Sequence, residues 1–201
     1  LRVRLVGQGR RRGADAVGVF DAAQSRKSRT ANAAVDGIGR TRRILVFDTL
    51  LQSFTPEEIE SVLAHELGHH VHGDIRRGLL VHGALLLVTA RLAALGLDAG
   101  VPLLGLTGPA DLAGLPWLAL VLMALGLIQL PLGNGFSRWI ERQADDFALA
   151  TTGNAPAFIG AMERLAQLNL AERRPNRLKE IVFYSHPALE RRIERARAGS
   201  A

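Results

Sequence analysis

Two long apolar stretches dominate the hydropathy pattern of the chain. The first covers residues 79–97 and is interrupted by His82 and Arg91, whereas the second covers residues 115–133 and contains no charged residue. Each stretch has about the 20 residues that a helix needs to cross the hydrocarbon core of a bilayer. The pattern therefore predicts a transmembrane helical hairpin inserted at 79–133. The alternative is a pair of helices buried in a soluble core.

Charged residues are distributed unevenly around this hairpin. The loop between the two stretches holds two aspartates and no basic residue. The outer flanks hold the arginines Arg76, Arg77, Arg138 and Arg142. Because basic residues favour the cytoplasmic side of a membrane, we expect both ends of the hairpin there. Two crossings return the chain to the side that it left, so the segment after residue 133 can meet the segment before residue 79.

A helix is predicted just before the hairpin. Thr55 can cap its N-terminus, Pro56 fits its first position, and Glu58 completes a capping box with Thr55. Apolar residues then follow at helical spacing, namely Ile59, Val62, Leu63 and Leu67. This helix carries the sequence His65-Glu66-Leu67-Gly68-His69.

Shorter elements flank these helices. Strand-like runs at 16–20, 31–35 and 43–47 predict a small β-meander. Beyond the hairpin, helical patterns lie at 137–150, from 154 to about 172, and at 189–198. We therefore expect a mainly α fold with a small β-meander, in a single domain over residues 1–201.

The composition narrows the class of protein. Of the 201 residues, 48% are hydrophobic and 22% are charged, which fits a soluble part joined to membrane segments. The absence of cysteine excludes disulfides and thiolate metal ligands. The formal charge is +6, but aromatic residues make up only 5% and no nucleic-acid recognition motif is present, so we expect no nucleic-acid partner. The chain begins with Leu1 rather than methionine, and we expect that its N-terminus is truncated.

The pattern His-Glu-x-x-His is typical of zinc-dependent peptidases. His65 and His69 lie one turn apart on the predicted helix and share a face, so both imidazoles can bind one ion. Glu66 lies beside that ion without binding it. It can accept the proton of a zinc-activated water and pass it to the leaving amine. The alternative is a pair of surface histidines on an amphipathic helix.

A catalytic zinc needs a third protein ligand and one open position. The metzincin pattern would place glycine at position 72 and histidine at position 75, but His72 and Ile75 stand there, which excludes that class. Glu141 is the better candidate because the hairpin returns it to the histidine helix. Asp145 shares its helix face and can orient a ligating histidine through the second ring nitrogen. A surface ion pair is the alternative for Glu141.

His186 is a further candidate, between Ser185 and Pro187. Its imidazole can donate a hydrogen bond to the oxyanion of a tetrahedral intermediate. Arg192 could assist it or hold a substrate carboxylate. The alternative for His186 is a histidine in a turn before proline.

Together these residues resemble the M48 metallopeptidases, the family of the Ste24 CAAX prenyl proteases and HtpX. The resemblance rests on three motifs in this order: His65-Glu-Leu-Gly-His69, Glu141-Arg-Gln-Ala-Asp145 and Ser185-His186-Pro187. It extends over about residues 16–198 and implies a gluzincin-like zinc peptidase with one zinc ion per chain, embedded in the lipid bilayer. It also implies that the strand around Asn32, Ala33 and Ala34 pairs with a peptide or protein substrate bound as an extended strand.

The predicted function is that of a Ste24-like peptidase, which hydrolyses peptide bonds. We expect the chain to be an integral protein of the cell membrane, with its active site facing the cytoplasm. Glu66 is the predicted general base, and His186 with Arg192 is predicted to stabilise the transition state. Two other functions stay open at this point. One is an HtpX-like quality-control protease for misfolded membrane proteins, and the other is a non-catalytic membrane scaffold with a vestigial zinc site.

Overall fold

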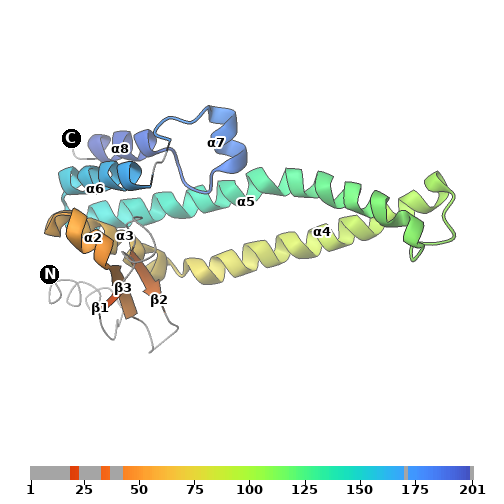
Figure 1. Cartoon of the computed structure of the whole chain (residues 1–201), viewed down its shortest axis with the longest axis horizontal. Helices are drawn as coiled ribbons and strands as arrows, with labels where there is room; N and C mark the ends of the chain where they lie inside the picture. The colour runs from red at the N-terminus through yellow and green to blue at the C-terminus, as the bar shows by residue number, and fades with distance from the viewer. Residues whose placement is uncertain (1–18, 23–32, 37–42, 170–171, 200–201) are drawn as a thin grey trace.

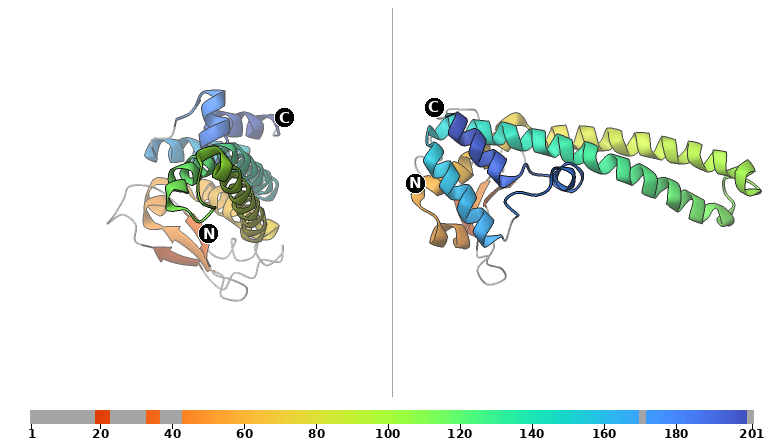
Figure 2. Two further views of the ribbon diagram at one scale, coloured as in Figure 1. Left: turned by 90° about the vertical axis from the view of Figure 1, so that its right-hand side faces the viewer. Right: turned by 90° about the horizontal axis from the view of Figure 1, so that it is seen from above.

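The computed structural model describes residues 19–22, 33–36, 43–169 and 172–199 (Figure 1). A small sheet and several helices form a head at one end, and two long helices extend from it as an arm (Figures 1 and 2). The described residues are mostly helical, which confirms the predicted mainly α fold.

The sheet of the head contains β1 (Val19–Ala22), β2 (Ala33–Asp36) and β3 (Arg43–Phe47). β3 lies in the middle, with β1 parallel to it on one side and β2 antiparallel to it on the other. The expected β-meander is therefore wrong in its topology, because a meander would pair β1 with β2. The most apolar run takes the central position, where a strand is paired on both edges. Residues 16–18 and 31–32 of the predicted strands lie outside the described residues.

The histidine helix forms as the sequence predicts. α2 (Asp48–Ser53) follows β3 and leads into α3 (Pro56–His72). The capping box is present, because the Glu58 backbone N–H donates to Thr55 Oγ1 and the Thr55 backbone N–H donates to Glu58 Oε2. Gly73 ends the helix with a φ of 68°, in the left-handed region that favours glycine. One buried cluster joins α3 to β3 and α2 through Val46, Leu50, Ile59, Val62 and Leu63.

The arm consists of α4 (Asp74–Leu104) and α5 (Leu115–Thr152), joined by a loop with the short 3-10 helix η2 (Leu112–Gly114). Both long helices have the length and apolar composition that a membrane crossing requires. In their most apolar 18-residue windows, 6% of the residues are buried in α4 and 0% in α5. Within the described residues these windows are therefore exposed, unlike those of helices packed in a core.

α5 continues without a break beyond its apolar stretch. The sequence predicted a separate helix at 137–150, but one helix runs from the loop to Thr152, with Pro131 inside it. The polar half of α5 thus extends the apolar half into the head (Figure 1). Any residue on the polar half is held rigidly relative to the apolar arm.

α3 and α5 approach each other closely at Gly68. A Cβ atom added to Gly68 would lie 3.1 Å from Ala144 Cα and 3.2 Å from Phe147 Cβ, which is tighter than ordinary contacts. Glycine at this position therefore allows α5 to lie directly against the part of α3 that carries His65 and His69.

Gly68→Val is expected to push α5 away from α3, because the new side chain would meet backbone atoms of Ala144. Overpacking of this kind lowers stability by roughly 1–3 kcal/mol. We expect a lower unfolding temperature in detergent and weaker zinc binding. Gly78→Val is the matched control, since nothing lies within 4 Å of a Cβ atom placed at Gly78. Equal zinc contents of the two variants would contradict the role assigned to this contact.

Shorter helices complete the described head: α6 (Ala155–Leu168), α7 (Arg177–Phe183) and α8 (Leu189–Ala198). α8 confirms the predicted basic helix, α6 ends earlier than predicted, and no sequence pattern predicted α7. A second buried cluster joins α3, α5, α6 and α8 through Ala64, Ala148, Phe158, Met162 and Ile193. α7 lies beside α5, farther along the arm than α6 and α8 (Figure 1).

Candidate active site

His65 and His69 of α3 turn toward one position. His65 is buried and His69 is half-buried. Their rings meet edge to face, and their Nε2 atoms lie 3.2 Å apart. This is the geometry that a spacing of four residues produces on a helix.

Glu141 reaches the same position from the polar half of α5. Its Oε2 lies 3.4 Å from His65 Nε2, and its Oε1 lies 3.5 Å from His69 Nε2. The three side chains offer ligand atoms that all lie within 4.8 Å of one another. Glu141 Oε2 is buried and accepts no hydrogen bond of good geometry from a described residue, and its neighbour is His65 Nε2. Because a buried carboxylate oxygen is unfavourable unless it is fully compensated, these residues fit a bound metal ion.

A carboxylate lies against the second ring nitrogen of each histidine. Asp145 Oδ1 lies 3.0 Å from His65 Nδ1, and Asp74 Oδ2 lies 2.9 Å from His69 Nδ1. The hydrogen bond of Asp74 is of the kind that holds the ring orientation and the tautomer of metal-binding histidines. Asp145 lies at ion-pair distance from His65 Nδ1 without forming a hydrogen bond of good geometry. The sequence pointed to Asp145, and the structure brings it next to His65.

Asp74 is a residue of the site that sequence reasoning missed. Gly73 turns the chain so that Asp74 begins α4 beside the last turn of α3. Arg77 Nη1 donates to Asp74 Oδ1 at 3.0 Å and to Gln143 Oε1 at 2.7 Å, which ties α4 to α5. The available signal was a carboxylate directly after a helix-ending glycine, five positions beyond His69.

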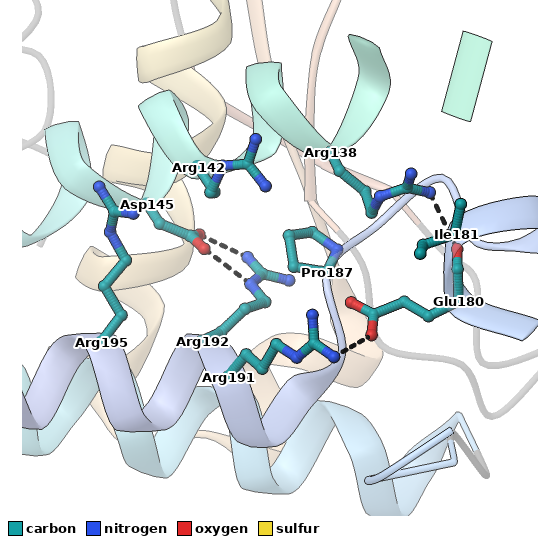
Figure 3. A pocket seen from close by; sticks show the side chains of 9 residues that line it. All are labelled: Arg138, Arg142, Asp145, Glu180, Ile181, Pro187, Arg191, Arg192 and Arg195. Atoms are coloured by element: carbon teal, nitrogen blue, oxygen red, sulfur yellow. Dashed lines mark hydrogen bonds and ion pairs between the residues drawn. The ribbon is translucent and has the colours of Figure 1, made fainter. Parts of the chain in front are cut away.

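Arg192 of α8 binds Asp145 through both sides of its guanidinium group. Its Nε lies 2.8 Å from Oδ2 and its Nη2 lies 2.5 Å from Oδ1 (Figure 3). The side chain is only 12% exposed. The guanidinium group therefore supports the carboxylate behind His65, whereas sequence reasoning placed it near the oxyanion or a substrate carboxylate.

Glu66 and His186 complete the set of predicted catalytic residues near the histidines. Burial raises the pKa of the half-buried Glu66 above its usual value, and the nearby His65 and His69 oppose this rise. His186 Nε2 lies 3.3 Å from Glu141 Oε1, and the His186 side chain is 61% exposed. An exposed imidazole beside the buried cluster can reach a molecule bound there.

The predicted substrate strand lies in part within the described residues. Ala33 and Ala34 belong to β2, whereas Asn32 lies outside the described residues. β2 pairs with β3 along one edge and contacts α3. Among the described strands, none pairs with the other edge of β2.

Known proteins share this arrangement of sequence and fold. The metalloprotease YhfN of Bacillus subtilis, named as uncharacterized, is 33% identical over 182 residues, which cover 89% of this chain and 43% of that protein. The protease HtpX of Stutzerimonas stutzeri is 30% identical over 201 residues, covering 90% of this chain and 65% of that protein. The chain therefore spans less than two thirds of the length of these relatives.

A solved structure shows the same fold. The crystal structure of S. mikatae Ste24p superposes with a TM-score of 0.77 at 24% sequence identity, over 96% of this chain and 48% of that one. The sequence profile of peptidase family M48 matches residues 8–199. That match covers the histidine helix, Glu141 and the His-Pro segment together, so the chain belongs to peptidase family M48.

Proposed function

We propose that this chain is a membrane-embedded zinc metalloendopeptidase. The observation that carries the proposal is the convergence of His65, His69 and Glu141 on one position, with Glu66 on the same helix as the histidines. Membership of a peptidase family supports a proteolytic function. A peptide or protein is the substrate class that follows.

One zinc ion per chain suits this set of donor atoms. His65, His69 and Glu141 would hold the ion through two imidazole nitrogens and one carboxylate. A zinc ion held there would supply Lewis-acid chemistry, namely polarisation of a carbonyl and activation of a water. Asp145 and Asp74 hold the imidazole rings in place, and Arg192 holds Asp145 and adds positive charge behind His65.

Glu66 acts as the general base in this proposal. As a carboxylate it accepts a proton from the attacking water, and as a carboxylic acid it gives that proton to the leaving nitrogen. His186 donates its Nε2–H to the oxyanion that develops on the substrate carbonyl.

The substrate lies extended along the edge of β2 that pairs with no described strand. Asn32, Ala33 and Ala34 offer backbone N–H and C=O groups for strand pairing. β2 contacts α3, the helix that carries the histidines, which supports this mode of binding.

The two apolar helices of the arm support a position of this site at a membrane surface. The apolar stretches 79–97 and 115–133 cross the cell membrane, with both outer ends in the cytoplasm as the flanking arginines indicate. Glu141 follows Gly133 by about 12 Å along α5, at 1.5 Å per residue. The active site thus lies just outside the hydrocarbon core and faces the cytoplasm.

Hydrolysis of unfolded casein by the purified chain in detergent tests this proposal. We expect cleavage that 1,10-phenanthroline abolishes and added zinc restores. A C-terminal lipopeptide, tested in parallel, separates a quality-control protease from an enzyme for lipidated substrates. A protein that binds zinc and cleaves neither substrate would favour the vestigial scaffold.

Zinc binding is expected to release a proton at neutral pH. Burial lowers the pKa of His65, but interactions with Asp145 and Glu141 outweigh it and raise the pKa to about 9. Zinc must displace this proton, so its apparent affinity should rise with pH, by up to about tenfold per unit, and level off above pH 9. Calorimetry in two buffers of different ionisation enthalpy counts the proton. An affinity that is constant between pH 7 and 9 would contradict the high pKa of His65.

A further inference from the structure

A pocket of about 270 Å³ lies between α5, α7 and α8, behind the Asp145–Arg192 pair (Figure 3). Its lining is strongly basic, with arginines entering from α5 and from α8: Arg138, Arg142, Arg191, Arg192 and Arg195. Two carboxylates, Asp145 and Glu180, also line it. The excess of positive charge indicates a ligand that is an anion.

Carboxylates neutralise part of this charge. Arg192 pairs with Asp145, Arg191 with Glu180 at 3.0 Å, and Arg195 with Asp146 at 2.6 Å. The two arginines of α5 differ from these three because they form no ion pair of this kind with a carboxylate of the described residues.

Among the five arginines that line the pocket, Arg138 and Arg142 form no ion pair with a carboxylate of the described residues. Arg138 Nη1 donates to the backbone carbonyls of Glu180 and Tyr184, at 2.9 Å and 2.5 Å. Arg142 is exposed and makes no hydrogen bond or ion pair with any residue that the structure describes. A guanidinium group without a partner at the rim of a basic pocket is suited to a phosphate group, which it can bind through two N–H groups.

The pocket also lies at a definite depth along the arm. Arg138 follows Gly133, the end of the apolar stretch, by about 7.5 Å along α5. The headgroup layer on each side of a bilayer is about 5–8 Å thick. If the stretch 115–133 spans the hydrocarbon core, Arg138 lies at the level of lipid phosphates.

α7 adds an apolar surface at the same level. Asn134 Nδ2 donates to the Val182 carbonyl at 2.6 Å, which fixes α7 beside the end of the apolar stretch. Its apolar side chains face outward, with exposed fractions of 70% for Leu178, 41% for Ile181 and 66% for Phe183. Apolar side chains at this depth can enter the boundary between headgroups and acyl chains. Ile181 also lines the pocket, so charge and apolar surface adjoin.

We propose that this pocket binds the phosphate group of an anionic phospholipid, with α7 contacting the glycerol and acyl region of the same lipid. The proposal rests on the membrane placement given under Proposed function. It adds a lipid site on the face of Asp145 and Arg192 that is opposite to His65. A free phosphate ion shares the chemistry of the headgroup, and the lipid tail distinguishes the two.

Native mass spectrometry of the full chain in detergent tests the site with three probes: dioctanoyl phosphatidylglycerol, dioctanoyl phosphatidylcholine and inorganic phosphate. We expect about one phosphatidylglycerol to bind per chain, at least tenfold more tightly than phosphatidylcholine. Arg142→Gln should weaken it about fivefold, the effect of one basic residue near anionic lipid. The zinc content of the variant shows that its fold is intact.

Arg76→Gln is the matched control, because Arg76 is an exposed arginine at the base of α4. Equal losses in the two variants would mean diffuse attraction to anionic lipid and would overturn the pocket. Inorganic phosphate that binds as tightly as phosphatidylglycerol would overturn the lipid assignment. Retention of the chain in carbonate-washed membranes tests the membrane placement separately, so a failed lipid titration counts against the pocket alone.

Discussion

Glu66→Gln is expected to retain one zinc ion per chain and to lose roughly 10²- to 10⁴-fold of its turnover, the usual contribution of a general base. Glutamine keeps the shape of the side chain but cannot accept the proton of the attacking water. The zinc ligands proposed here do not include Glu66, so metal content should not change. Zinc analysis and casein hydrolysis on the same preparation provide the measurement.

Glu57→Gln is the matched control for this substitution. Glu57 lies in the first turn of the same helix and is exposed, so the same chemical change is made away from the histidines. Wild-type turnover in Glu66→Gln would remove Glu66 from the mechanism. Loss of zinc in that variant would instead indicate that Glu66 helps to build the metal site.

Local patterns in the sequence were sufficient to predict the parts of the site that depend on a single helix. The capping box of Thr55 and Glu58 sets where α3 begins, and helical spacing then determines that His65 and His69 share a face. The two apolar stretches predicted two long helices, because a single segment that crosses a bilayer can pair its own backbone N–H and C=O groups only as a helix. The approach of Glu141 to the histidine helix could be predicted because a hairpin of two crossings brings the chain back to the side from which it started.

Features that depend on contacts distant in sequence could not be predicted in this way. The parallel pairing of β1 with β3 depends on the order and direction of the strands in the sheet, and three short runs do not settle either. Asp74 becomes a partner of His69 only because Gly73 adopts a left-handed conformation. α7 is too short for periodicity to reveal it, and its position depends on the hydrogen bond from Asn134.

The continuity of α5 has a mechanical consequence. The apolar half of this helix and the residues Glu141 and Asp145 belong to one rod, whereas the histidines belong to α3. A tilt of the arm relative to the head would therefore move the carboxylate relative to both imidazoles. The close contact at Gly68 and the bonds of Arg77 to Asp74 and Gln143 oppose such a tilt.

Glu141→Ala is expected to lose zinc, because it removes the only proposed ligand that comes from outside α3. Two imidazoles on one helix then remain, and we expect the affinity to fall by more than the 10- to 100-fold that loss of a supporting partner costs. The loss of zinc affinity in Asp145→Asn should stay within that range of 10- to 100-fold, because this substitution weakens the support of His65 and leaves all three ligands in place.

Asp146→Asn provides the control for charge on α5, because Asp146 is exposed and pairs with Arg195 at the surface. Zinc affinities from competition with a chelator should therefore decrease in the order Asp146→Asn, Asp145→Asn, Glu141→Ala. If Glu141→Ala bound zinc as tightly as Asp146→Asn, the third ligand would have to be sought elsewhere. His186 would then be the first candidate, since its Nε2 lies 3.3 Å from the carboxylate that the substitution removes.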